Sequence, residues 1–146
     1  MAVLKYKIDA KNDGTDRTVV SCRDFSFIID EPVIAGGENS GPTPVEYLIG
    51  SLAGCMGVVC NKVAKEMNLE VSSIRFEIEG DIDTDRFMGK PGSEEKRSGY
   101  SEIRVKIDAD VNADAQTKYR WLKAVKERCP VSDNISNMTP VRVKLV

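Results

Sequence analysis

An α+β fold with antiparallel sheet is predicted by the order of apolar patterns along the chain. Two segments have the spacing of helices, at about 44–67 and 112–128. Short segments of alternating apolar and polar residues indicate half-buried strands at about 4–8, 18–29, 74–78, 103–107 and 141–145. Because the strands come in groups and do not alternate one by one with helices, antiparallel sheets packed around the long first helix are expected.

The N-terminal part is predicted to begin with a β-hairpin. Residues 4–8 alternate, and the Asn-Asp-Gly at 12–14 supplies a turn. If the strand at 18–29 runs without a break, Arg23 lies on its more apolar face. The alternative is a turn at Arg23 and Asp24, with both side chains in water.

The first helix has a clear start signal. Residues 30–44 are dense in Gly and Pro and predict an irregular loop. Thr43 can cap the helix, Pro44 suits its first turn, and Glu46 stands where a capping-box carboxylate reaches back. The roughly 23 residues would extend about 35 Å. A stripe of glycines on one side indicates that another backbone packs close to the helix: Gly50, Gly54 and Gly57.

The second helix is expected to be capped by Asn112 and to end at Arg128, because Pro130 disfavours helix at Cys129. Three of its residues are expected to face inward: Tyr119, Leu122 and Val125. Before it, the polar segment 83–99 is interpreted as a long mobile connection or an extended hairpin end.

Composition and charge argue against several classes of function. A chain of 146 residues has the usual size of one domain, so 1–146 is expected to form a single domain. A formal charge of -2, with acids and bases interleaved, argues against nucleic-acid binding. The longest uncharged run, between Glu46 and Lys62, is short for a membrane span, and the first residues do not form a signal peptide. A cytoplasmic protein without membrane contact is expected.

The absence of histidine removes further possibilities. Ser-His and Cys-His catalysis and the usual imidazole metal sites need this side chain. The four cysteines show none of the close pairing of structural zinc sites, so no metal and no cofactor are expected. In a reducing compartment these cysteines should be thiols.

Two cysteines hold special positions: Cys55 near the middle of the apolar helix, and Cys129 just before a proline. Position alone does not make a thiol reactive, because buried free cysteine is a common small apolar residue. The sequence segments around the two cysteines are more specific indicators of function. They are Asp-Glu-Pro at 30–32, Gly-Gly-Glu-Asn-Ser-Gly-Pro-Thr-Pro-Val-Glu-Tyr-Leu at 36–48, Ser-Leu-Ala-Gly-Cys at 51–55, Gly-Tyr-Ser at 99–101 and Cys-Pro-Val-Ser at 129–132. Together they resemble the OsmC/Ohr family of osmotically inducible and organic hydroperoxide resistance proteins.

The resemblance implies an intertwined homodimer with an antioxidant role in stress response. In it, Cys55 attacks an organic hydroperoxide, Cys129 resolves the sulfenic acid as a disulfide, and a dithiol reductant resets the pair. Cys60 cannot resolve Cys55 on an intact helix, because five residues turn it through about 140° and separate the Cα atoms beyond the roughly 7 Å that a disulfide tolerates. We assign Cys60 and Cys22 to packing.

Two charged residues are candidates for activating Cys55. A thiol of pKa about 8.5 needs a nearby cation to ionise at neutral pH, and Arg23 is the candidate, with Glu46 orienting its guanidinium. Family peroxidases carry a glutamate directly after the helix-starting proline, where this chain has Val45. Glu46 and Cys55 are nine residues apart on one helix, so any contact between them would have to come from another subunit. The ordinary role of Glu46 is a cap.

Two functions remain open. The first is a thiol-dependent peroxidase for organic hydroperoxides, with an apolar substrate lining of Leu52, Met56, Phe87 and Met88. The second is a non-peroxidatic relative that binds a small apolar or sulfur-containing ligand or exchanges thiols. The displaced glutamate favours the second function, and the presence of both motif cysteines weakens a third, purely structural interpretation.

Overall fold

The structure is a computed structural model that describes residues 3–145. It divides into two compact units, residues 1–50 and 51–146, and the long helix α1 (Pro44–Glu66) runs through the boundary. Both helices and strands are present, and the strands pair antiparallel, which confirms the predicted α+β class. That residues 1–146 act as one domain stays a prediction.

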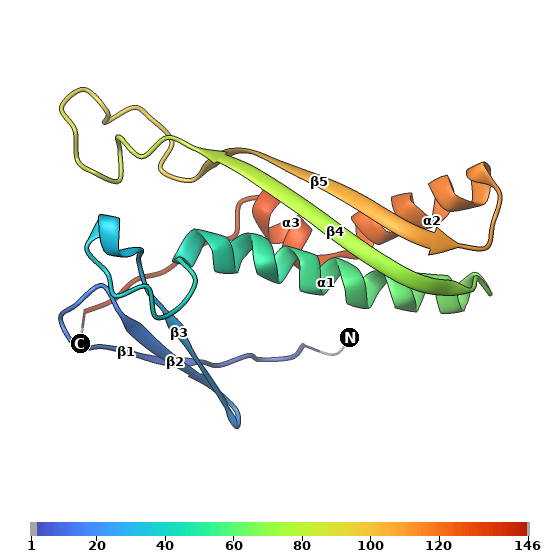
Figure 1. The fold of residues 1–146 in the computed structure, drawn as a ribbon, viewed down its shortest axis with the longest axis horizontal. Coiled ribbons are helices and arrows are strands. Elements are labelled where there is room, and N and C mark those ends of the chain that lie inside the picture. Colours follow the sequence, from blue (N-terminus) through green and yellow to red (C-terminus); the bar gives the residue numbers. More distant parts are fainter. Residues whose placement is uncertain (1–2, 146) are drawn as a thin grey trace. The chain divides into compact units, whose positions relative to one another are not determined.

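The first unit holds a three-stranded antiparallel sheet of order β1-β2-β3 (Figure 1). Its strands are β1 (Asp9–Asn12), β2 (Thr18–Cys22) and β3 (Phe25–Ile29). The predicted N-terminal hairpin is therefore present, but its first strand lies at 9–12 and residues 3–8 form no strand. The alternation at 4–8 was an incomplete signal, because a strand also needs a neighbour to pair with.

Arg23 lies in the turn between β2 and β3, so an unbroken strand over 18–29 is wrong. Its φ of 55° is the left-handed conformation that a two-residue hairpin turn requires. The side chain is exposed, and its guanidinium carbon lies 5.2 Å from the centre of the Phe25 ring. The alternative placement of Arg23 and Asp24 in a solvent-facing turn is confirmed.

The Gly- and Pro-rich loop that follows β3 is organised by one buried carboxylate. Asp30, 1% exposed, accepts hydrogen bonds from the Glu31 N–H (2.8 Å), the Ser40 N–H (2.9 Å) and the Ser40 hydroxyl (2.7 Å). The hydroxyl bond is the main reason that the pKa of Asp30 lies below its ordinary value. A Cβ on Gly37 would lie 2.0 Å from the Glu31 carbonyl oxygen, so only glycine fits there. The loop, which includes η1 (Val33–Ala35), is thus a defined lead into α1.

Helix α1 begins with the predicted capping box. The Thr43 N–H donates to Glu46 Oε2 (2.8 Å), and the Glu46 N–H donates to Thr43 Oγ1 (3.3 Å). By length and composition alone the helix could cross a membrane. A core helix has the same properties, and the second unit buries six residues of α1: Leu52, Met56, Val59, Cys60, Val63 and Ala64.

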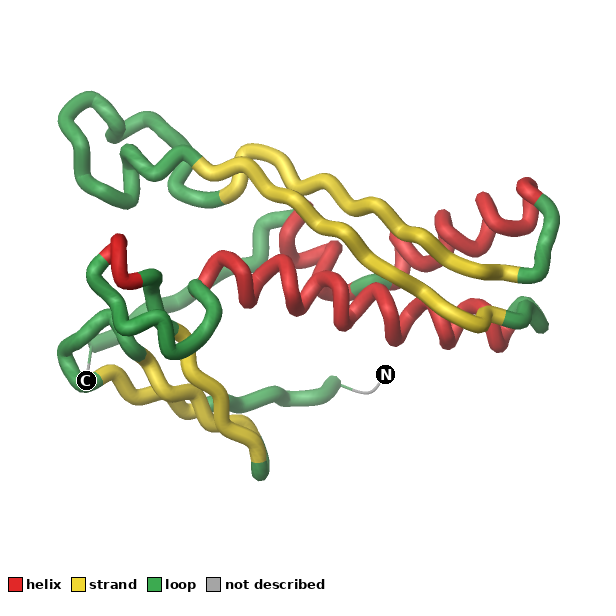
Figure 2. Tube along the Cα trace, in the orientation of Figure 1, coloured by secondary structure: helices red, strands yellow, loops and turns green. Residues whose placement is uncertain are grey.

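The second unit packs a two-stranded ribbon over helices. Strands β4 (Val71–Ile82) and β5 (Tyr100–Val111) are antiparallel and lie alongside α1, α2 (Ala115–Arg128) and α3 (Pro130–Ser136) (Figures 1 and 2). The apolar residues predicted at 74–78 and 103–107 pack against the buried helix residues. Both predicted strands are confirmed, and each is longer than the alternating pattern indicated.

Helix α2 differs from its prediction in two respects. Its cap is Asp114, whose carboxylate accepts from the Thr117 N–H (2.7 Å), rather than Asn112. Trp121 and Val125 are the buried residues, whereas Tyr119 is 69% exposed and the inward position predicted for it is wrong. The chain then re-forms a short helix, α3, that was not predicted. Residues 141–145 form no strand.

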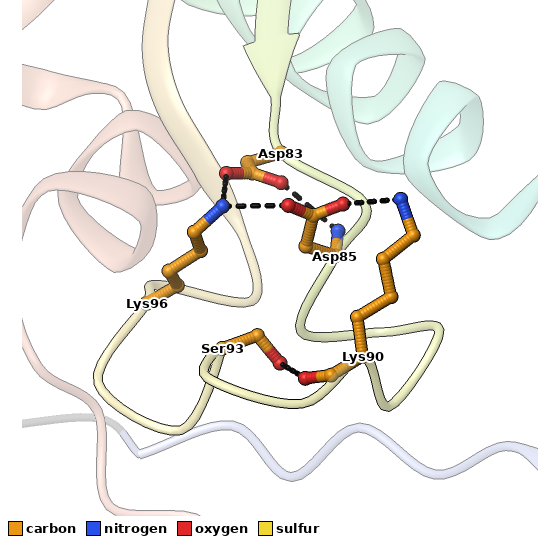
Figure 3. A network of polar contacts seen from close by, with 5 residues as sticks. All are labelled: Asp83, Asp85, Lys90, Ser93 and Lys96. Atoms are coloured by element: carbon orange, nitrogen blue, oxygen red, sulfur yellow. Dashed lines mark hydrogen bonds and ion pairs between the residues drawn. The ribbon is translucent and has the colours of Figure 1, made fainter.

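The segment between β4 and β5 forms the extended hairpin end that was one of the two structures predicted for 83–99. Lys96 contacts Asp83 (2.8 Å) and Asp85 (2.6 Å), and Lys90 contacts Asp85 from the other side (2.6 Å) (Figure 3). The buried Ser93 hydroxyl donates to the Lys90 carbonyl oxygen (2.6 Å). These contacts close the segment on itself.

Candidate active site

The structure brings together the two cysteines predicted to form the redox pair. The sulfur atoms of Cys55 and Cys129 lie 3.2 Å apart. Cys55 is half-buried and Cys129 is 1% exposed. Because the S–S bond of a disulfide is about 2 Å, the sulfurs need to approach by only about 1 Å to become linked.

Cys129 is held at the junction of two helices. It is both the C-cap residue of α2 and the N-cap residue of α3, and its backbone is extended (φ -83°, ψ 108°). Pro130 occupies the first position of α3, where its missing N–H costs nothing. The Cys129 sulfur accepts from the Ser132 N–H (3.5 Å). Next to it, Arg128 pairs with Glu66 through both ends of its guanidinium, which ties the end of α2 to α1.

The surroundings of Cys55 favour the neutral thiol. Burial raises the pKa of Cys55, and the adjacent Cys129 thiol raises it further, whereas the Val131 backbone N–H lowers it. Among residues 51–145, no lysine or arginine contributes to the pKa of Cys55. The Cys129 sulfur, 3.2 Å away, therefore disfavours ionisation of Cys55.

Cys60 lies in the core, away from solvent. Its side chain is 0% exposed, and burial raises the pKa of its thiol to about 11. Its carbonyl oxygen accepts a hydrogen bond from the indole N–H of Trp121 (3.0 Å), which joins α1 to α2. Cys22 is half-buried at the end of β2.

The predicted charged residues are not brought to Cys55 in the described contacts. Arg23 belongs to the first unit, and its activation of Cys55 stays a prediction. Glu46 Oε2 accepts from the N–H (2.8 Å) and the hydroxyl (2.9 Å) of Thr43, and the Glu46 side chain is exposed. These bonds explain why the pKa of Glu46 lies below its ordinary value. They give Glu46 a capping role, and its part in activating Cys55 stays a prediction.

A mainly apolar cavity of about 410 Å³ in the second unit is lined by sequence neighbours of the two cysteines, although neither cysteine lines it. Leu52 and Met56, one turn before and one residue after Cys55, line it as predicted. Phe87 and Met88 lie in the exposed loop between β4 and β5 instead, at 75% and 64% exposure. The remaining lining comes from β5, α2 and α3: Ile103, Val105, Ile107, Leu122, Val125, Lys126, Ser132, Ile135 and Ser136.

The contributions of Val131 and Ser132 were missed, because they act through backbone N–H groups. The proline after Cys129 was interpreted only as the end of α2, although proline is also common in the first turn of a helix. Among the described residues, no group of three or more cysteines and carboxylates is placed to hold a metal ion.

Comparison with known proteins gives consistent similarities. The sequence profile of the OsmC-like protein family matches residues 37–144. An OsmC-like protein from Mycoplasma pneumoniae aligns with a TM-score of 0.78 at 18% identity, over 92% of this chain and 89% of that chain. The organic hydroperoxide resistance protein OhrB of Bacillus subtilis aligns with a TM-score of 0.61 at 22% identity, over 94% of each chain. An organic hydroperoxide resistance protein from Legionella pneumophila aligns at 0.64 and 18% identity, over 92% and 91%. No curated protein sequence matches.

Proposed function

The chain belongs to the OsmC-like protein family, and we propose that it reduces organic hydroperoxides with Cys55 as the attacking thiol and Cys129 as the resolving thiol. The observation that carries this function is the 3.2 Å approach of the two sulfurs. The similarity to proteins described as organic hydroperoxide resistance proteins points the same way.

The two thiols and an external reductant account for every bond and electron in the reaction. The Cys55 thiolate attacks the terminal oxygen of the hydroperoxide, the O–O bond breaks, and the alkoxide leaves as an alcohol after protonation. The Cys55 sulfenic acid then condenses with the Cys129 thiol, which releases water and forms the disulfide. An external dithiol supplies two electrons to restore both thiols. Such recycling fits a reducing compartment such as the cytoplasm.

Ionisation of Cys55 is the demanding step. Within its own unit the thiolate is favoured by the Val131 N–H and opposed by burial. The proposed activating cation is Arg23, delivered in the assembled protein; without a cation, the fraction of thiolate at neutral pH is small.

Stopped-flow oxidation tests this function. Reduced protein is mixed with cumene hydroperoxide or with hydrogen peroxide, and the loss of free thiol is followed. We expect wild type to be oxidised faster by cumene hydroperoxide than by hydrogen peroxide. Cys55→Ser should show no oxidation at the active site, and Cys129→Ser should accumulate a stable sulfenic acid at Cys55. Cys22→Ser is the matched control. Peroxide consumption that is unchanged in Cys55→Ser would refute the assignment.

A second function, thiol exchange without rapid peroxide chemistry, is favoured by one observation: the raised pKa of Cys55 without a cation from its own unit. In that case the disulfide between Cys55 and Cys129 should form readily from a small disulfide reagent, while oxidation by cumene hydroperoxide stays as slow as that of a free cysteine.

We further propose that the protein is an intertwined homodimer. On α1, a Cβ added to Gly50 or Gly54 would have no neighbouring atom within 4 Å. Val58 on the same helix is 69% exposed. The alternating segments 3–8 and 141–145 are unpaired in the single chain and expose their apolar residues. A second copy could cover these surfaces. Sedimentation should show a dimer at micromolar concentration, and a stable monomer would refute this assembly.

A further inference from the structure

We propose that the redox state of the cysteine pair controls the order of helix α3, so that the surface between α2 and α3 differs between the thiol form and the disulfide form. As thiols, Cys55 and Cys129 cap the first turn of α3; on forming a disulfide they release it. This inference rests on the proposed pairing of the two cysteines, and it concerns a conformational switch rather than the substrate.

Helix α3 is too short to be stable on its own. It has seven residues, whereas an isolated helix shorter than about 12–15 residues is only marginally stable in water. The structure describes every residue of α3, and none of them is buried. Its apolar contacts with the buried cluster come from the half-buried Val131 and Ile135. The order of α3 therefore depends strongly on how its first turn is capped.

The first turn of α3 is capped by sulfur atoms. Pro130 has no N–H, so two N–H groups of this turn, those of Val131 and Ser132, need acceptors outside the hydrogen bonds of the helix. The Ser132 N–H donates to the Cys129 sulfur (3.5 Å). The Val131 N–H donates to the Cys55 sulfur and is the contact that favours its thiolate. Both N–H groups are thus satisfied by the two atoms that a disulfide would link.

Disulfide formation has to move these acceptors. The two sulfurs lie 3.2 Å apart and a disulfide bond is about 2 Å long, so they approach each other by about 1 Å. If Cys129 moves, its contact with the Ser132 N–H, already 3.5 Å long, is weakened further. If Cys55 moves, the contact with the Val131 N–H is affected in the same way. Linking the sulfurs also abolishes the thiolate form, which is the stronger acceptor.

The surface between α2 and α3 should change with this step. A hollow of about 530 Å³ lies between the two helices, and α3 with its C-cap residue forms one wall of it: Ser132, Asp133, Ser136 and Asn137. The opposite wall belongs to α2, which stays attached to α1 through the bond from the Trp121 indole to the Cys60 carbonyl oxygen. Loosening of α3 therefore displaces one wall and leaves the other in place. A molecule that binds between the helices can then distinguish the two forms of the protein.

Hydrogen exchange measures the order of α3 directly. The protein is compared in its reduced form and after treatment with diamide, which removes two electrons and two protons from the two thiols without any peroxide. The amides followed are those of 133–137, which include the bonds from Asp133 to the Cys129 carbonyl oxygen (3.0 Å) and from Asn137 to the Asp133 carbonyl oxygen (2.9 Å). We expect these amides to exchange about two- to tenfold faster in the disulfide form, the range for a lost helix cap. Unchanged or slower exchange there would overturn the inference.

Substitutions separate the loss of the cap from the disulfide itself. Cys129→Ala removes one sulfur acceptor and should show fast exchange at 133–137 without any oxidation. Cys129→Ser keeps a hydroxyl oxygen that can cap the turn, so it should exchange slowly with or without diamide. Cys55→Ser keeps the Cys129 sulfur but cannot form the disulfide, and as the matched control it should not respond to diamide. Slow exchange in Cys129→Ala would contradict the capping role of the sulfur.

The use of diamide separates this inference from the peroxidase function, because the disulfide then forms whether or not the protein reduces hydroperoxides. Faster exchange of α3 in the disulfide form of a protein that consumes no peroxide would refute only the peroxidase function. Equal exchange of α3 in both forms of an active peroxidase would refute only the switch. Failure of diamide to link Cys55 to Cys129, seen in the mass of the intact protein and its peptides, would refute both.

Discussion

Removal of the Cys60 thiol should make the protein less sensitive to alkaline pH. The side chain is fully buried, and burial raises the pKa of its thiol from 9.0 to about 11. Above pH 9 the unfolded chain therefore loses a proton that the folded chain retains. Folding stability then falls as pH rises, because the unfolded state binds fewer protons.

The size of the effect follows from the two pKa values. With 9.0 unfolded and about 11 folded, the free energy of unfolding drops by about 1.4 kcal/mol at pH 10 relative to neutral pH. Above pH 11 the loss would approach about 2.7 kcal/mol, the full equivalent of two pKa units. Cys60→Ala avoids this loss, at the cost of about 1 kcal/mol for the small cavity that it leaves.

Urea unfolding at pH 8 and pH 10 measures the effect. Wild type should be the more stable protein at pH 8 by about 1 kcal/mol, and this advantage should be lost at pH 10, where wild type alone loses about 1.4 kcal/mol. Val63→Ala is the control, because it truncates a buried side chain of the same helix that has no titratable group. Its cavity penalty, corrected for the change that Cys60 causes in both proteins, should not change with pH. A difference between wild type and Cys60→Ala that is the same at both pH values would show that burial does not hold this thiol neutral.

Three other substitutions probe the fold. Gly37→Ala should destabilise the protein by at least about 2 kcal/mol in urea, because its Cβ would lie 2.0 Å from the Glu31 carbonyl oxygen; wild-type stability would contradict this packing. Trp121→Phe should cost about 1–3 kcal/mol, since it removes the indole donor to the Cys60 carbonyl oxygen, and a loss no larger than that of an exposed substitution would contradict the bond. Lys96→Met should speed chymotrypsin cleavage in the loop between β4 and β5, because it removes two ion pairs that close the loop; an unchanged cleavage rate would show that these pairs do not order it.

The sequence predicted those elements whose signals are local. The capping box of Thr43 and Glu46 set the start of α1, and the alternation at 74–78 and 103–107 placed β4 and β5. The unbroken strand over 18–29 failed at Arg23, because a hairpin turn at two charged residues leaves the period-2 pattern intact on both sides. The predicted inward position of Tyr119 failed because helix periodicity does not fix which apolar residue meets the core.

Only part of the candidate site could be predicted from the sequence. The two cysteines could be paired through the resemblance of their surroundings, but the backbone donors of α3 have no side-chain signature. The cavity is lined by residues of α1, β5, α2 and α3, and no local pattern in the sequence places these elements beside one another. Such neighbours come from distant parts of the chain.

The indole of Trp121 gives the molecule an optical reporter of its own. It is the single tryptophan of the chain, it is 4% exposed, and it belongs to the same buried cluster as Cys129. Thiols, thiolates and disulfides quench indole emission to different degrees when they are close. The emission intensity should therefore change when Cys129 becomes linked to Cys55. The thiol and disulfide states of the protein could then be followed in real time without a label, even for peroxides that absorb no visible light.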